Sequence, residues 1–75
     1  MVIMEFDTNT LGSVLRDRRL DLGMTQQDLS QLIKVAPSTI SNYELGIVHP
    51  TLGTLMKILR ALKIDELRID TGRRP

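Results

Sequence analysis

The sequence contains no cysteine and no tryptophan, and it has only one tyrosine and one phenylalanine. Without cysteine, disulfides and thiolate metal sites are excluded. So little aromatic surface disfavours a reader of single-stranded or RNA bases, because such readers stack unpaired bases on aromatic rings. No apolar run approaches the roughly 20 residues that cross a bilayer, and the opening residues lack a basic flank. We therefore expect a cytoplasmic, nucleoid-associated protein with no membrane partner.

An excess of charge of one sign is also lacking. Ten Lys and Arg stand against nine Asp and Glu, which gives a net charge of +1. Any nucleic-acid function must therefore depend on where the charges lie. The 75 residues make room for one small domain with a thin core. Because no disulfide can support that core, we expect a homodimer.

Apolar residues recur at helical spacing in four segments. A capping box at Thr25 and Asp28 begins the second segment, Pro37 suits the first turn of the third, and Thr51 caps the fourth. Gly23 and Gly46 end the first and third. Candidate caps for the first helix are Thr8, Asn9 and Thr10. The predicted helices cover residues 11–22, 26–33, 37–45 and 52–62.

The third predicted helix has two unlike faces. Its outer face carries Ser38, Ser41 and Asn42, which are short hydrogen-bonding side chains in place of the long charged ones of an ordinary solvated face. Its inner face and the apolar sides of the other helices form the expected core. That core comprises Leu11, Val14, Leu15, Leu22, Leu29, Leu32, Ile33, Ala36, Ile40, Tyr43, Ile47, Leu52, Leu55, Ile58, Leu59 and Leu62.

The two ends of the chain differ from the helical part, which is expected over residues 10–63. Residues 1–9 read as an extended segment or short strand, and residues 64–71 alternate in a way that favours a strand over a last helical turn. A lone strand is unstable in water, so it must pair. Its partner is either a second copy across a dimer axis or the alternation of Val2, Met4 and Phe6. Residues 72–75 are expected to be a disordered tail.

A helix, a tight joint and a helix with a polar outer face form the unit whose second helix fits a DNA major groove. An ordered set of residues between positions 11 and 62 accompanies this unit: Leu11-Gly12-Ser13-Val14-Leu15-Arg16, Arg19, Gly23-Met24-Thr25-Gln26, Leu29, Ser38-Thr39-Ile40-Ser41, Glu44, Gly46, Pro50-Thr51-Leu52 and Leu55. Through these residues, in register and without gaps, the sequence resembles the phage-repressor, Cro and XRE-like family. The resemblance implies an all-α, compact four- to five-helix repressor-like helix-turn-helix domain that binds double-stranded DNA as a transcriptional repressor, without a cofactor.

An enzyme is disfavoured. His49 is the only histidine, and the sequence shows no carboxylate pair and no glycine-rich phosphate loop.

The resemblance implies a role for particular residues. Gln26 matches a glutamine that binds a DNA phosphate and buttresses the recognition helix, where the helix dipole also favours an anion. Asn42 matches a base-reading position and can bond adenine through N6 and N7. The alternatives are an exposed helix-start residue for Gln26 and a solvated amide for Asn42. The predicted DNA contacts are Thr25, Gln26, Lys34, Pro37, Ser38, Thr39, Ser41, Asn42 and His49.

Other positions match or depart from the family pattern. Arg19 and Glu44 match an ion pair that ties the first helix to the third. Lys34 stands where relatives often have glycine, so a left-handed joint there would cost on the order of 1 kcal/mol. Ala36 replaces the usual serine cap of the recognition helix, at a cost of about 1 kcal/mol.

The loop after the third helix is apolar, at Leu45, Ile47 and Val48, where relatives often place cations. Fewer cations imply a modest and less salt-dependent DNA affinity. These residues either close the local core or lie in a dimer interface, for which we predict Ile47, Val48, Leu67 and Ile69. A twofold dimer would place two recognition helices about 34 Å apart on a near-palindromic operator.

The C-terminal part is similar to the HipB-type antitoxins, which pair a strand such as 67–69 across the dimer. That subfamily implies a HipA-like kinase toxin as a partner. The alternative is a protein-interaction module of the same fold with weak or no specific DNA binding, as the uncharged recognition helix and the apolar loop suggest.

Overall fold

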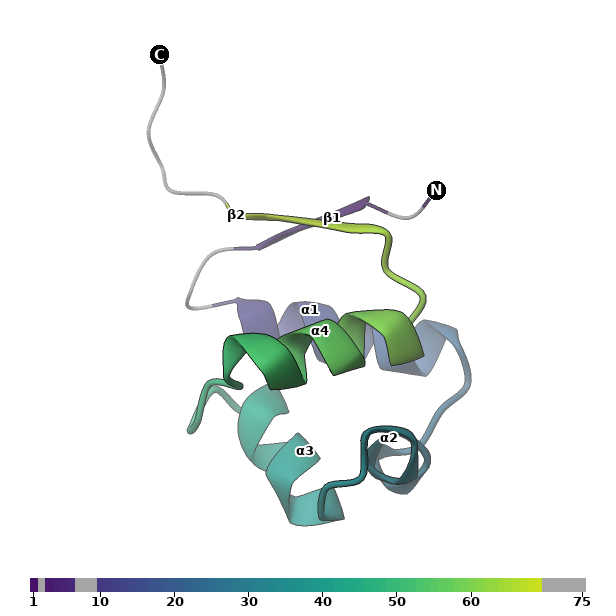
Figure 1. Cartoon of the computed structure of the whole chain (residues 1–75), viewed down its shortest axis with the longest axis vertical. Coiled ribbons are helices and arrows are strands. Elements are labelled where there is room, and N and C mark those ends of the chain that lie inside the picture. Colours follow the sequence, from purple (N-terminus) through teal and green to yellow (C-terminus); the bar gives the residue numbers. More distant parts are fainter. Residues whose placement is uncertain (2, 7–9, 70–75) are drawn as a thin grey trace.

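The computed structural model describes residues 1, 3–6 and 10–69. Within that part, four helices make up most of the structure, and two short strands lie at its ends (Figure 1). The predicted all-α, repressor-like helix-turn-helix class is confirmed. No helix in the described ranges is long and apolar enough to cross a bilayer. The helices are α1 (Leu11–Asp21), α2 (Gln26–Ile33), α3 (Pro37–Glu44) and α4 (Leu52–Ala61).

Local signals fix most of the helix ends. The Thr25 hydroxyl accepts the N–H of Asp28 at 3.0 Å, and the Asp28 carboxylate accepts the N–H of Thr25 at 2.9 Å, which completes the capping box. Thr51 caps α4 by accepting the N–H of Thr54 at 3.3 Å. Gly23 follows α1 with φ +69°, and Gly46 follows α3 with φ +75°. Both are left-handed positions that favour glycine.

The core lies where the four helices meet, and Leu62 is fully buried in it. Gly12 sets the approach of α1 to α3, because a Cβ there would lie 2.5 Å from the carbonyl oxygens of Tyr43 and Glu44. The family resemblance included Gly12, but no role was predicted for it. The buried apolar residues are Leu11, Leu15, Leu29, Ile33, Ile40, Ile58, Leu62 and Ile64.

The expected core was wrong at four positions. Leu32 is 59%, Ile47 is 67% and Leu52 is 75% exposed, and Ala36 is exposed as well. Ala36 precedes the first turn of α3, and Ile47 follows the left-handed Gly46, so neither continues the inner face of that helix. Leu32 and Leu52 lie on outward sides of α2 and α4 that no other described element covers.

The strands are β1 (Ile3–Phe6) and β2 (Glu66–Ile69), which pair in parallel with Ile3 opposite Glu66. In Figure 1 they lie on the side of α1 and α4 that faces away from α2 and α3. Within the chain, the partner of the C-terminal strand is thus the N-terminal strand, which is one of the two pairings expected from the sequence. Each strand of a two-stranded sheet keeps one unpaired edge, so pairing across a dimer stays a prediction.

Several sequence predictions fall outside the described residues. These are the caps Thr8 and Asn9, the contribution of Val2 to the first strand, the end of the predicted strand beyond residue 69, and the tail at 72–75.

Candidate nucleic-acid interface

The joint between α2 and α3 is tight and left-handed. Lys34 ends α2 with φ 60° and ψ 50°, as expected for a position where relatives carry glycine. The N–H of Val35 then donates to the carbonyl of Ser30 at 3.0 Å, which closes the end of α2. Pro37 begins α3, and Ala36 provides no side-chain cap. The joint therefore sets the entry angle of α3 through the backbone alone.

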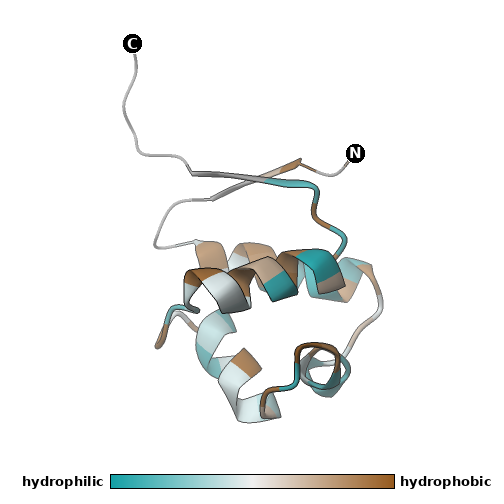
Figure 2. Cartoon of the chain, in the orientation of Figure 1, coloured by the Kyte–Doolittle hydropathy of each residue, from teal (hydrophilic) through white to brown (hydrophobic). Residues whose placement is uncertain are grey.

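The outer surface of α3 carries small polar groups. Pro37 and Ser38 are exposed, and Thr39, Ser41 and Asn42 are half-buried. Within residues 3–6 and 10–69, no hydrogen bond involves the side chains of Ser38, Thr39, Ser41 or Asn42. Figure 2 shows most of α3 in the pale tints of weakly polar residues. The hydrogen-bond donors and acceptors of these four side chains are thus available to a ligand, such as base edges in a DNA groove.

A buried ion pair holds α3 against α1. Arg19 Nε donates to Glu44 Oε2 at 2.7 Å and Arg19 Nη2 donates to Glu44 Oε1 at 3.0 Å, so the pair is bidentate. The two side chains are only 7% and 3% exposed. The hydrogen bond to Glu44 raises the pKa of Arg19 above its usual value, against the opposing effect of burial. Arg19 Nη1 also donates to the carbonyl of Met24 at 2.6 Å, which fixes the loop before α2.

Gln26 joins this network from the first turn of α2. Its Nε2 donates to Glu44 Oε1 at 3.1 Å, and the side chain is half-buried. Gln26 thus contacts α3 through Glu44, which fits the buttressing part of its predicted role. The carbonyl oxygen and the second N–H of its amide make no hydrogen bond in the described structure.

The start of α2 also presents backbone N–H groups. The N–H groups of Thr25 and Asp28 are each bound by the other residue's side chain. The N–H groups of Gln26 and Gln27, by contrast, have no acceptor among the described residues. Such free amides at a helix N-terminus suit a phosphate. The backbone N–H of Thr25 lowers the pKa of the exposed Asp28 carboxyl, so this acid stays charged beside them. Asp28 is therefore the unfavourable neighbour of any phosphate bound here.

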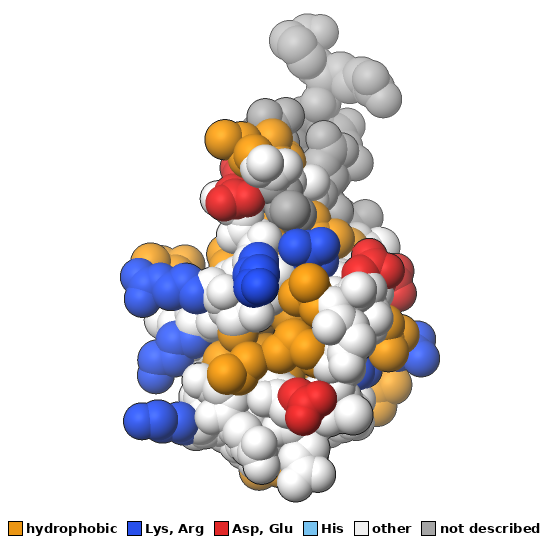
Figure 3. Space-filling view, turned by 90° about the vertical axis from the view of Figure 1, so that its right-hand side faces the viewer, with side chains coloured by type: hydrophobic (Ala, Val, Ile, Leu, Met, Phe, Trp, Pro, Cys, Tyr) orange, Lys and Arg blue, Asp and Glu red, His pale blue; other side chains and the backbone are white. Residues whose placement is uncertain are grey.

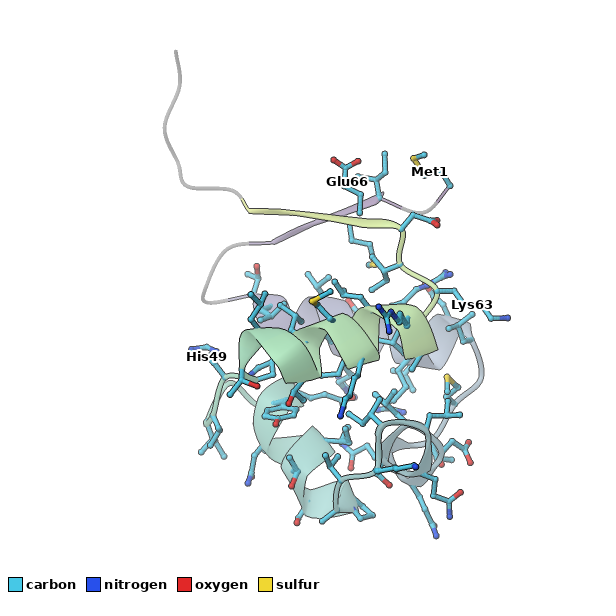
Figure 4. The ribbon with its side chains drawn as sticks, in the orientation of Figure 1. Met1, His49, Lys63 and Glu66 are labelled. Atoms are coloured by element: carbon cyan, nitrogen blue, oxygen red, sulfur yellow. The ribbon has the colours of Figure 1, made fainter. Side chains whose placement is uncertain are left out.

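The remaining predicted contacts lie at the edges of α3. Lys34 is exposed at the joint before the helix, and His49 is exposed in the loop after it. In Figure 4, His49 and Lys63 lie at opposite ends of α4. Between α3 and His49, the loop residues Ile47 and Val48 are 67% and 48% exposed. The interpretation that these apolar residues close the local core was wrong. The side chains of Leu67 and Ile69, predicted at the same dimer interface, lie outside the described part of the structure.

One further polar contact had no counterpart in the sequence reasoning. Arg18 donates from Nε to the carbonyl of Leu62 at 2.9 Å and from Nη2 to that of Lys63 at 3.4 Å. It therefore caps the C-terminal end of α4. No sequence signal marks this contact, because the partner is a backbone carbonyl 44 residues away.

Comparison with known proteins identifies the family to which this fold belongs. A family model described as helix-turn-helix matches residues 15–69. The chain belongs to the XRE-like helix-turn-helix family. The fold and family are those of DNA-binding transcriptional regulators. The chain is similar to the restriction-modification controller protein C.AhdI from Aeromonas hydrophila, with 28% identity, a TM-score of 0.73, and 77% of this chain and 88% of that chain covered.

Two further similarities bear on the function. HipB, in a structure of a HipB–O1–O2 complex, shares 32% identity with a TM-score of 0.68, over 80% of this chain and 87% of HipB. The human endothelial differentiation-related factor 1 is 35% identical over 66 residues, which are 88% of this chain and 45% of that protein. The chain thus spans less than half the length of the curated relatives it matches.

Proposed function

We propose that this chain is a transcriptional repressor that reads a specific sequence of duplex DNA with α3. The observation that carries the proposal is the outer surface of α3, where the side chains of Ser38, Ser41 and Asn42 have no hydrogen-bond partner in the described structure. The buried Arg19–Glu44 pair holds this surface from behind. Asn42 would bond an adenine in each half-site, while Ser38 makes a more permissive contact.

Phosphate contacts would flank this reading surface. The start of α2 offers the Gln26 amide and free backbone N–H groups, the joint offers Lys34, and the loop offers His49. Thr25, Pro37, Thr39 and Ser41 complete the set of contacts we propose. With so few cations, the affinity per subunit is modest and its salt dependence is shallow.

The exposed loop after α3 supports the proposal of a homodimer. Leu45, Ile47 and Val48 are apolar and 48% to 70% exposed, and they adjoin the end of α3. A twofold axis beside this loop would bury them and set two copies of α3 about one duplex turn apart, on a near-palindromic operator. The open edge of β2, with Leu67 and Ile69, is the second proposed contribution to this dimer.

A DNA titration tests the proposal. The purified protein is titrated with the DNA upstream of its own gene and with an unrelated duplex, at about 50 mM and about 200 mM salt. We expect a sequence-selective complex that salt weakens. Asn42→Ala should lose about 1–3 kcal/mol of selectivity, whereas Gln26→Ala should weaken binding on both duplexes alike. Gln31→Ala, an exposed glutamine further along α2, is the matched control. A wild-type protein that does not distinguish the duplexes contradicts the proposal.

A finer proposal is that the protein is the antitoxin and autorepressor of a HipA-type system. It is supported by the similarity to HipB over 80% of the chain. Co-purification from the native cell tests it, because an antitoxin should bring down a kinase encoded beside it. Recovery of the protein without a kinase contradicts this role and leaves the DNA-binding proposal intact.

A protein-interaction module is the alternative function. It is favoured by the uncharged outer surface of α3 and by the similarity to multiprotein-bridging factor 1 of Eremothecium gossypii, at 38% identity over 55 residues. That relative is covered over only 36% of its length. The same titration separates the two functions, because an interaction module would show no selective complex.

A further inference from the structure

The outer face of α4 is a surface that DNA reading does not use. Five exposed residues share this face at helical spacing: Leu52, Gly53, Met56, Lys57 and Arg60. Leu52 is 75% exposed and Met56 is 48% exposed. The face is therefore apolar towards the start of α4 and basic towards its end.

Gly53 makes this face smooth at a cost in stability. Its φ is not positive, and a Cβ there would meet no atom within 4 Å. Neither backbone conformation nor internal packing thus requires glycine, although glycine within a helix costs up to about 1 kcal/mol relative to alanine. A bare backbone is useful where another chain approaches closely.

Lys57 and Arg60, the cations at the end of this face, form no ion pair with the described residues. Residues 31–64 contain four cations, and their single acid, Glu44, is buried against Arg19. No ion pair involves Lys57, Arg60 or Lys63 in the part of the chain that the structure describes. Arg18 already binds the carbonyls of Leu62 and Lys63 just past α4, so these two carbonyls do not need the cations of this face. Figure 3 shows several Lys and Arg side chains along one side of the molecule, below an acidic patch on the same side.

We propose that the outer face of α4 docks a helix of a partner protein whose apolar side chains are flanked by Asp or Glu. Leu52 and Met56 would form the apolar centre, Gly53 would allow close approach, and Lys57 and Arg60 would pair with the acids. DNA phosphates are a poor match, because Leu52 and Met56 have no donor to offer them. A second copy facing this surface across a twofold axis would bring like charges together.

The test uses the full chain labelled with 15N and a synthetic amphipathic helix built from Leu and Glu as the probe. The peptide should shift the amide signals of α4 and leave those of α3 unchanged. Lys57→Glu with Arg60→Glu should weaken peptide binding about tenfold, and more at low salt. Gly53→Gln should weaken it too while keeping or raising the melting temperature, because its side chain enters open space.

Three controls make the outcome decisive. Arg16→Glu reverses an exposed cation on α1 and should leave peptide binding unchanged. A peptide with Lys in place of Glu should not bind. Peptide shifts on α3, or equal affinity of the wild type and both α4 variants, would overturn the proposal. A loss of DNA affinity in the Lys57→Glu and Arg60→Glu variant as large as that of Gln26→Ala would assign the surface to DNA instead. Failure of DNA reading by α3, measured in the separate titration, leaves this proposal untouched.

Discussion

Lys34 is a residue whose replacement by glycine should stabilise the protein. Its φ of 60° and ψ of 50° place it in the left-handed region, where a residue with a Cβ is disfavoured by about 1–2 kcal/mol. Glycine removes that strain but adds freedom to the unfolded chain, which costs about 0.4–1 kcal/mol. Because the Lys34 side chain is exposed, no packing is lost. The net gain should be about 0.5–1 kcal/mol.

Thermal and urea unfolding measure this gain. For a domain of this size, a gain of that order raises the melting temperature by about 2–8 °C. Lys34→Ala is the matched control, because it removes the same charge and keeps the strained backbone. If alanine stabilises the protein as much as glycine does, the benefit comes from charge removal and the backbone reasoning is refuted. Both variants should lower the salt dependence of DNA binding equally if Lys34 contacts a phosphate.

Three further predictions concern packing, the buried pair and pH. Gly12→Ala should destabilise the protein by about 1–3 kcal/mol, because the new Cβ would meet backbone carbonyls at 2.5 Å. Urea unfolding measures this loss, and an unchanged free energy of unfolding would contradict the prediction. Glu44→Ala should lower the free energy of unfolding by about 3–5 kcal/mol, because it leaves Arg19 charged and buried. The double variant Arg19→Met with Glu44→Leu should recover much of that loss. A Glu44→Ala variant as stable as the wild type would contradict this prediction. The hydrogen bonds between Asp28 and Thr25 stabilise the fold above the usual Asp pKa of 3.8, and this stability is lost as the pH falls through the lower pKa of the folded state. The free energy of unfolding, measured as a function of pH, should therefore fall in this acidic range. Asp28→Asn should remove that pH-dependent step.

The helices were predictable because their ends are signalled locally. The capping box at Thr25, the cap at Thr51 and the glycines after α1 and α3 act within a few residues of the chain, so spacing alone locates them. The left-handed conformation of Lys34 was also predictable, from the family resemblance. Each of these features needs no knowledge of what packs against it.

The remaining features depend on partners distant in the sequence. Leu52 satisfies the apolar spacing of α4 but lies on its exposed side, which only the placement of neighbouring helices decides. The parallel pairing of β1 with β2 joins the two ends of the chain, and the alternation of either strand cannot specify it. Arg18 binds the carbonyls of Leu62 and Lys63, just past α4, and an arginine on a helix surface gives no hint of such partners. The family resemblance predicted that Gln26 buttresses the recognition helix, but not that it does so through Glu44.

The C-terminal end of α3 is held by α1. The close approach at Gly12 and the bidentate pair from Arg19 both act on Tyr43 and Glu44, at the C-terminal end of α3. The other end of α3, where Ser38 is exposed, is positioned by the joint at residues 34–36, whereas Gln26 acts through Glu44 on the same end as Arg19. Changes in α1 should therefore tilt the reading surface without touching DNA. If α3 reads DNA as proposed, a small misplacement of its donors would weaken every base contact together, so α1 would contribute to the binding energy without contacting a base.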